Sequence, residues 1–247
     1  MKYLILIGLC LPLFSLAENS PTEEKINAAL EHERRNEKDH ARDDNRSPIE
    51  TLKFFRFEDN QTVLELLPGG GWYTKILGPV LEEKGKLYVS IGTNTVEKMI
   101  VDQPGFSTTE VIPFDGITRS ETEQPRYTMP EFSFGVRKLD LVLTFRNMHN
   151  FDAVGRANLN RASFDTLKKG GLYGVVDHTR RHMQPDTREV WRRMDPLQII
   201  KEVESAGFRF VDYADLHYRP DDELRYEVGR KTVTGNTDRF TLLFEKP

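Results

Sequence analysis

Residues 62–77, TVLELLPGGGWYTKIL, place a short apolar run, a proline and three consecutive glycines directly before an amphipathic stretch. Thr62–Leu67 has the length and character of a buried strand, and Trp72–Glu83 has helical spacing. Glycine packs nothing and loses the most backbone entropy on folding, so three together are costly. The pattern predicts a strand-to-helix turn whose main-chain N–H groups approach a ligand at the head of the helix. The alternative is a tight connection that binds nothing.

Apolar runs and amphipathic stretches then alternate along the chain. The other expected strands are Lys86–Ile91, Glu110–Pro113, Leu139–Thr144, Leu172–Asp177, Phe208–Ala214 and Arg239–Phe244. The other expected helices are Val96–Asp102, Asp152–Lys169 and Asp195–Ala206. Strands separated by helices predict an α/β fold, a mostly parallel seven-stranded sheet with helices on both faces. The last strand follows a long polar connection without a helix, so we expect it to be antiparallel. We expect a loop or irregular insertion over Thr118–Pro130.

The first 17 residues predict a secretory signal peptide. They contain one lysine, a short apolar stretch and small residues before Glu18. The alternative, a retained anchor, is disfavoured because the apolar stretch is too short to span a bilayer. We therefore expect an exported, periplasmic protein. Cys10 is the only cysteine, so the remaining chain can form no disulfide and hold no zinc through thiolates.

Residues 18–46 are mostly charged, and we expect a solvated helical extension there, with partial disorder as the alternative. The domain proper should span 47–247. Ser47 is the expected N-cap of a short helix, with Pro48 at its first position and Glu50 completing a capping box. The net charge of −4 becomes −5 without the signal segment, which argues against a nucleic-acid partner or an anionic membrane. We expect no membrane span after the signal is removed.

Four segments carry a resemblance to a known superfamily: VLELLPGGGWYTKIL, DLVLTFRNMHNF, LKKGGLYGVVDH and AGFRFVDYADL. In this order they resemble the strand motifs of class I S-adenosylmethionine-dependent methyltransferases. With the closing TDRFTLLFEKP, the chain is similar to a family of exported bacterial predicted methyltransferases. The resemblance covers roughly 48–247. It implies a Rossmann-like sheet and S-adenosylmethionine as the cofactor.

The resemblance also implies which residues bind that cofactor. Glu65 matches the acid of the first-strand motif, and Gly69, Gly70 and Gly71 match its glycine turn. Asp115 matches an acidic residue that contacts the adenine amino group of the cofactor. Phe145 and Arg146 lie where the methionine end of the cofactor is expected. One departure concerns the second strand, which commonly ends in an acid that grips the ribose. Here Ser90 or Asn94 could offer only a neutral hydrogen bond. The first-strand motif also departs from the family pattern, because Leu66-Leu67-Pro68 stands where a glycine often follows the acid.

Polar residues at the ends of the fourth and fifth strands are the candidates for chemistry. These are Asn147, His149, Asn150, Asp177 and His178. His149 is the first choice for a base, because imidazole titrates near neutral pH. The alternative is a loop histidine that binds the backbone. Asp177 and His178 could act with it or could only stabilise a loop.

Two further patterns, a histidine-containing segment and a run of arginines, could each form a binding site or have a simpler structural explanation. DHTRRH offers Asp177, His178 and His182 as metal ligands, but its two arginines oppose a cation, and we expect no metal. Five arginines lie within 180–193: Arg180, Arg181, Arg188, Arg192 and Arg193. They could recognise an anionic acceptor. The simpler reading, which we favour, is a solvated helix face whose arginines pair with Asp186, Glu189 and Asp195.

The sequence thus favours an exported methyltransferase that acts on a small or envelope acceptor. Two alternatives remain open. One is a non-catalytic exported protein that binds a small ligand and keeps the methyltransferase fold. The other is a scaffold that uses its charged N-terminal helix to hold a partner.

Overall fold

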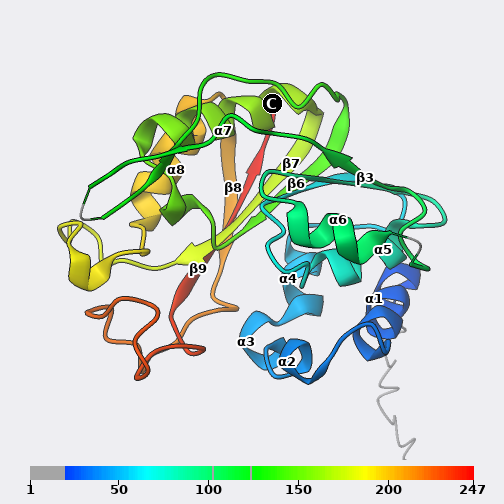
Figure 1. The fold of residues 1–247 in the computed structure, drawn as a ribbon, viewed down its shortest axis with the longest axis horizontal. Coiled ribbons are helices and arrows are strands. Elements are labelled where there is room, and N and C mark those ends of the chain that lie inside the picture. The colour runs from blue at the N-terminus through cyan, green and yellow to red at the C-terminus, as the bar shows by residue number, and fades with distance from the viewer. Residues whose placement is uncertain (1–19, 102, 123) are drawn as a thin grey trace, which may run out of the picture.

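The computed structural model of this chain describes residues 20–101, 103–122 and 124–247 (Figure 1). The predicted signal peptide, residues 1–17, lies outside the described residues and stays a prediction. None of the described helices is long and apolar enough to cross a membrane.

One sheet of seven strands organises the fold. Its strands are β1 (Thr62–Leu66), β2 (Lys86–Ser90), β3 (Thr109–Ile112), β6 (Leu139–Phe145), β7 (Leu167–His178), β8 (Arg209–Ala214) and β9 (Arg239–Glu245). Their order is β3-β2-β1-β6-β7-β9-β8. The pairs from β3 to β7 are parallel, and β9 is antiparallel to both of its neighbours. The predicted fold class, including the antiparallel last strand, is confirmed.

Helices cover both faces of the sheet. On one face, α1 (Pro21–Glu31), α4 (Pro48–Phe54), α5 (Thr74–Leu81) and α6 (Asn94–Ile100) pack against Val63 and Leu141. On the other, α7 (Ala153–Thr166) and α8 (Pro196–Ser205) pack against Leu64 and Val142. Side chains of a strand alternate between faces, so the apolar residues on the two sides of β1 and β6 supply both cores.

Several element boundaries differ from the prediction. β7 begins at Leu167, so Gly170 and Gly171 lie inside a strand and not in a turn before it. Gly170 has φ 74°, and the pairing of β6 with β7 shifts register between Leu139 and Leu141. The insertion at 118–130 contains two short antiparallel strands, β4 (Thr118–Arg119) and β5 (Tyr127–Thr128).

The N-terminal extension is three helices and not one solvated helix. After α1 come α2 (Glu37–His40) and α3 (Asp43–Arg46), which Figure 1 shows in blue below the sheet. Nε1 of Trp72 donates to the carbonyl of Asp39 across 3.0 Å, and Nζ of Lys75 pairs with the Asp39 carboxylate at 2.6 Å. These contacts hold α2 on the residues that follow the glycine turn.

The predicted capping of α4 is wrong in its mechanism. Pro48 does begin the helix, but Ser47 has φ 38° and its side chain makes no capping bond. Because α3 ends directly at Ser47, this residue takes the left-handed conformation that ends one helix and turns the chain into the next. Thr51 stabilises the junction, donating through its hydroxyl to the carbonyl of Arg46 at 3.0 Å.

Candidate functional site

The carboxyl edge of the parallel strands carries three strained residues. Leu67 follows β1 with φ 50°, Ile91 follows β2 with φ 67°, and Arg146 follows β6 with φ 65°. Residues other than glycine rarely adopt a backbone conformation with positive φ, and a β-branched residue such as Ile91 does so least of all. These strands are neighbours in the sheet. Strain of this kind gathers where a binding site demands a particular backbone path.

A cavity of about 190 Å³ lies against the glycine turn, and we call it the glycine cavity. It is lined by Asp39, Arg42, Arg46, Glu65, Leu67, Pro68, Gly69, Gly70, Trp72, Tyr73, Phe145, Arg146 and Asn147. A Cβ added at Gly69 or Gly70 would meet no atom within 4 Å, so the space beside both residues is open. Gly71 differs, because a Cβ there would lie 2.9 Å from Cε of Met99 on α6. Gly69 and Gly70 thus open the turn, whereas Gly71 allows α6 to pack.

Aromatic and amide contacts hold the cavity in shape. The rings of Tyr73 and Phe145 stack with centroids 3.6 Å apart. The guanidinium of Arg46 lies over Trp72 at 4.3 Å from the ring centre. The side-chain amide of Asn147 donates to the carbonyl of Leu66 at 3.3 Å, which joins the ends of β1 and β6. Asn147 therefore positions the turn and lines the cavity.

Glu65 is a buried acid behind the turn. Its side chain accepts a hydrogen bond from the Thr74 hydroxyl at 2.6 Å. Burial raises the pKa of Glu65 to about 7; the Thr74 hydrogen bond and the nearby Arg46 oppose that rise without cancelling it.

The pKa of Glu65 predicts a pH dependence of stability. The folded chain holds this proton more tightly than the unfolded chain, whose glutamate titrates near 4.5. The contribution of Glu65 to the free energy of unfolding should therefore be greatest below pH 4.5 and should fall by roughly 3 kcal/mol as the pH rises to about 7. Urea unfolding across this range should show that the free energy of unfolding of the native chain, relative to that of Glu65→Gln, falls by this amount. Glu121→Gln, at an exposed position, is the control and should keep the native slope. Equal slopes for the native chain and Glu65→Gln would contradict the prediction.

His149 and Asp177 form a buried pair across β6 and β7. Nδ1 of His149 donates to Oδ1 of Asp177 at 2.6 Å, and the His149 backbone N–H donates to Oδ2 at 2.9 Å. Asp177 is fully buried and His149 is 5 % exposed. The carboxylate fixes the tautomer, leaving Nε2 of His149 as the acceptor nitrogen. Nε2 has no hydrogen-bond partner within 20–101, 103–122 and 124–247. The pair has the arrangement of an oriented general base.

His149 lines a second cavity of about 550 Å³, which we call the arginine cavity. Its lining is Ala41, Arg42, Asn45, Arg46, Arg146, His149, Asn150, His178, Arg192, Val228, Gly229, Thr234, Gly235, Thr237 and Arg239. Part of this lining comes from α3 and the residues just before it, and part from the connection between β8 and β9. Figure 1 shows both segments below the sheet, the first in blue and the second in orange to red. Arg42, Arg46 and Arg146 line both cavities, so the glycine turn and His149 face adjoining spaces.

His178 lies beside this pair and not in a metal site. Its Nδ1 is 2.8 Å from the Thr237 hydroxyl, and its ring centre is 5.5 Å from that of His149. Burial, followed by His149 and nearby arginines, holds its pKa well below the usual range, so it is neutral. His182 instead pairs with Asp195 at 2.8 Å. The three residues considered as metal ligands therefore do not converge.

Two predicted cofactor residues lie apart from the cavities. The hydroxyl of Ser90 is turned inward and donates to the carbonyl of Ile112 at 2.9 Å. Asp115 is exposed and lines neither the glycine cavity nor the arginine cavity. The other predicted residues, apart from Gly71 and Asp177, line one or both cavities. Asp177 joins the site through His149.

The arginine run at 180–193 is not a solvated helix face, so that reading is wrong. Arg193 is fully buried in an ion pair with Asp222, and Arg180 pairs with Asp186 at 3.1 Å. Only Arg192 of the run lines the arginine cavity. The run breaks up because its residues lie in a loop and a short 3-10 helix, where consecutive side chains point to different neighbours.

Sequence reasoning missed Arg42, Arg46 and Arg239 as site residues. The first two sit in a segment whose charges suggest a solvated surface, and the third begins the last strand. No local motif marks them. The burial of Arg46 and Arg239 without a carboxylate paired to either side chain is visible only in the folded chain.

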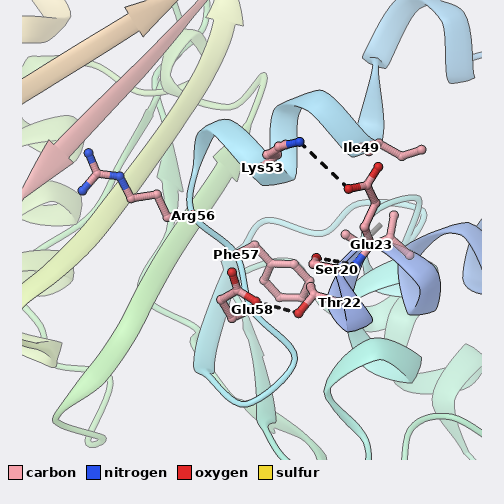
Figure 2. A pocket seen from close by; sticks show the side chains of 9 residues that line it. Ser20, Thr22, Glu23, Ile49, Lys53, Arg56, Phe57 and Glu58 are labelled. Carbon is pink, nitrogen blue, oxygen red and sulfur yellow. Dashed lines mark hydrogen bonds and ion pairs between the residues drawn. The ribbon is translucent and has the colours of Figure 1, made fainter. Parts of the chain in front are cut away.

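Another hollow, of about 290 Å³, lies between α1 and α4 near the start of β1 (Figure 2). Several of its polar groups bind each other: the Thr22 hydroxyl donates to Glu58 at 2.6 Å, and Ser20 accepts from the backbone of Glu23. Lys53 reaches Glu23 at 4.0 Å. It lies at the opposite end of β1 from the glycine turn and contains no predicted site residue.

Comparison with known proteins finds no matching family and no matching curated protein. Solved structures do match. A SAM-dependent methyltransferase from Aquifex aeolicus is 17 % identical, with a TM-score of 0.58 over 91 % of this chain and 98 % of that one. The chain has the methyltransferase fold. The [4+2]-cyclase SpnF matches at 15 % identity, with a TM-score of 0.57 over 82 % of this chain and 80 % of that one. Human N-acetylserotonin methyltransferase in complex with SAM matches at 16 % identity and a TM-score of 0.51, over 82 % of this chain and 51 % of that one.

Proposed function

We propose that this chain is an S-adenosylmethionine-dependent methyltransferase. The observation that carries the proposal is the adjacency of an open glycine turn and a buried His149–Asp177 pair, in two cavities that share three arginines. Both lie at the carboxyl edge of the parallel strands, where open α/β sheets bind their ligands. The fold alone does not identify the reaction, since one of the matching structures is a cyclase.

The residues present fit the amino-acid half of the proposed cofactor. Gly69 and Gly70 leave open space for close approach, and the Glu65 side chain lines the same cavity. The nucleoside half has less support, because Ser90 bonds inward and the strand offers no acid to the ribose. When bound, the cofactor supplies an activated methyl group. The chain itself would hold the acceptor in line, exclude water and take the acceptor's proton on Nε2 of His149.

Ser90 and the exposed Asp115 also favour a second candidate, a binding protein without catalysis. Both candidates bind a small ligand at the glycine turn, and only the enzyme transfers the methyl group. Incubation with methyl-labelled cofactor and extracted envelope material separates the two, because the enzyme labels a compound in the extract. The export expected from residues 1–17 makes the envelope the first source of acceptor to test.

Gly70→Leu tests the proposed binding site. The added side chain enters open space at a residue without positive φ, so the fold should be retained while the cavity is filled. We expect calorimetry to give a dissociation constant below about 1 mM for S-adenosylhomocysteine with the native chain, and a loss of at least roughly tenfold in the variant. Ala157→Leu adds bulk at an exposed site on α7 and should bind normally. Failure of the native chain to bind either form of the cofactor would refute the proposal.

A further inference from the structure

The charged side chains that line the arginine cavity are all cationic. Five arginines and two histidines contribute to it, and no aspartate or glutamate does. These arginines come from α3 and the residue before it, the end of β6, the segment before α8 and the start of β9. A solvated surface normally mixes charges of both signs, so a concave region with one sign attracts the opposite charge.

Several of these arginines have no carboxylate partner. The side chains of Arg42, Arg46 and Arg146 make no hydrogen bond or ion pair with any residue in the described parts of the chain. Arg239 donates through Nη1 to the carbonyl of Asn45 at 2.6 Å, while its buried Nε has no partner there. Only Arg192 is neutralised, by Glu227. The cavity therefore holds three arginines whose side chains have no direct carboxylate partner among the described residues.

Burial makes this arrangement costly. Arg46 is 6 % exposed and Arg239 is 7 % exposed. Burial, with repulsion from Arg146 as the next cause, lowers the pKa of Arg46 to about 9 and that of Arg239 to about 10. Both remain cationic at neutral pH. Buried charges without partners are destabilising, and a bound anion would remove that cost.

We propose that the arginine cavity binds the methyl acceptor through neighbouring oxyanion groups, phosphate or carboxylate, carried by one small molecule. That the bound molecule is the methyl acceptor rests on the proposed function. Binding of an anion in this cavity does not depend on the cofactor. The guanidinium fork binds either oxyanion through paired hydrogen bonds. The same cavity is lined by His149, so an anion held by the arginines brings the rest of its molecule to Nε2.

The test is calorimetry of the full chain, without cofactor, against inorganic pyrophosphate and against citrate at constant ionic strength. We expect at least one of them to bind with a dissociation constant below roughly 1 mM, and glycerol to give no heat. Tighter pyrophosphate indicates a phosphorylated acceptor, and tighter citrate indicates a polycarboxylate. No binding of either anion would overturn the proposal.

Variants locate the site. Arg42→Gln and Arg146→Gln should each raise the dissociation constant roughly 10- to 100-fold, because each removes a charged hydrogen-bond donor. Arg42 is exposed, so its variant should fold even if Arg146→Gln does not. Arg209→Gln is the control, because Arg209 pairs with Glu245 on the edge strand outside both cavities. An equal loss in the control would overturn the proposal, since it would mean general charge attraction.

A competition arm separates the two proposals. With saturating S-adenosylhomocysteine present, anion affinity should change less than about twofold, because the acceptor and the cofactor occupy adjoining spaces. If the cofactor displaces the anion, the arginines serve the cofactor's own carboxylate and the acceptor site is refuted. If the cofactor does not bind but the anion does, the proposed methyl transfer fails while the anion site stands.

Discussion

His149→Gln lowers the initial rate of methyl transfer to the acceptor by roughly 10²- to 10⁴-fold, the range expected when a general base is removed. Glutamine keeps a side chain of similar reach but cannot take a proton at neutral pH. Asp177→Asn should reduce the rate similarly, because an amide can no longer hold the imidazole as a donor through Nδ1. The measurement is transfer of labelled methyl groups from the cofactor to extracted material.

A second histidine–aspartate pair provides a matched control. His182 pairs with Asp195 at 2.8 Å, but its side chain is 57 % exposed and lines neither cavity of the site. His182→Gln should leave the rate unchanged. Binding of S-adenosylhomocysteine should survive in all three variants within about twofold, since none of the three residues lies at the glycine turn. A His149→Gln enzyme with native activity would remove His149 from the chemistry.

Asp222→Ala should lower the free energy of unfolding by roughly 3 to 5 kcal/mol. Asp222 and Arg193 form a fully buried ion pair, with two parallel hydrogen bonds of 2.9 and 3.0 Å. The carboxylate also accepts from the backbone of Asp238 at 2.7 Å and of Leu224 at 3.1 Å. Removing it leaves an uncompensated guanidinium and two unsatisfied amides in the interior.

Urea unfolding measures this loss, and an exposed pair supplies the comparison. Arg230 and Glu189 lie 48 % and 62 % exposed, so Glu189→Gln should cost less than about 1 kcal/mol. Asp222 sits in the connection between β8 and β9, which contributes Thr234, Gly235 and Thr237 to the arginine cavity. We therefore expect Asp222→Ala to weaken anion binding as well. A loss of stability no larger than that of Glu189→Gln would contradict the structural role given to the pair.

Much of the fold could be predicted from local patterns. Strand β1, the glycine turn and α5 follow one another within twenty residues, and their periods and glycines identify them directly. The long helix-free connection predicted the antiparallel β9. His149 and Asp177 were both predictable as polar residues at strand ends. They meet because β6 and β7 are parallel neighbours in which Phe145, the last residue of β6, lies opposite Val176, so Asp177 and the residues after β6 lie at the same edge of the sheet.

Predictions that depended on distant partners were less successful. Ser47 has the residue type of an N-cap, but it lies between two helices and must turn the chain instead. The arginines at 180–193 look alike in sequence, yet Arg193 is buried by Asp222 and Arg192 reaches the cavity. Ser90 could have faced a ribose, but its hydroxyl bonds to β3.

The sequence by itself determined how the seven main strands and the helices between them alternate along the chain. It also determined the open turn at Gly69 and Gly70 and the polar residues at strand ends. These features could be predicted because periodicity and backbone preference act over a few residues. Only the tertiary structure decided that Arg42, Arg46, Arg146 and Arg239 face one cavity. These residues are separated by up to about two hundred positions and come together through packing of the sheet and its extensions. Their unpaired charge is a property of that assembly, since each arginine alone could have found an acid or water.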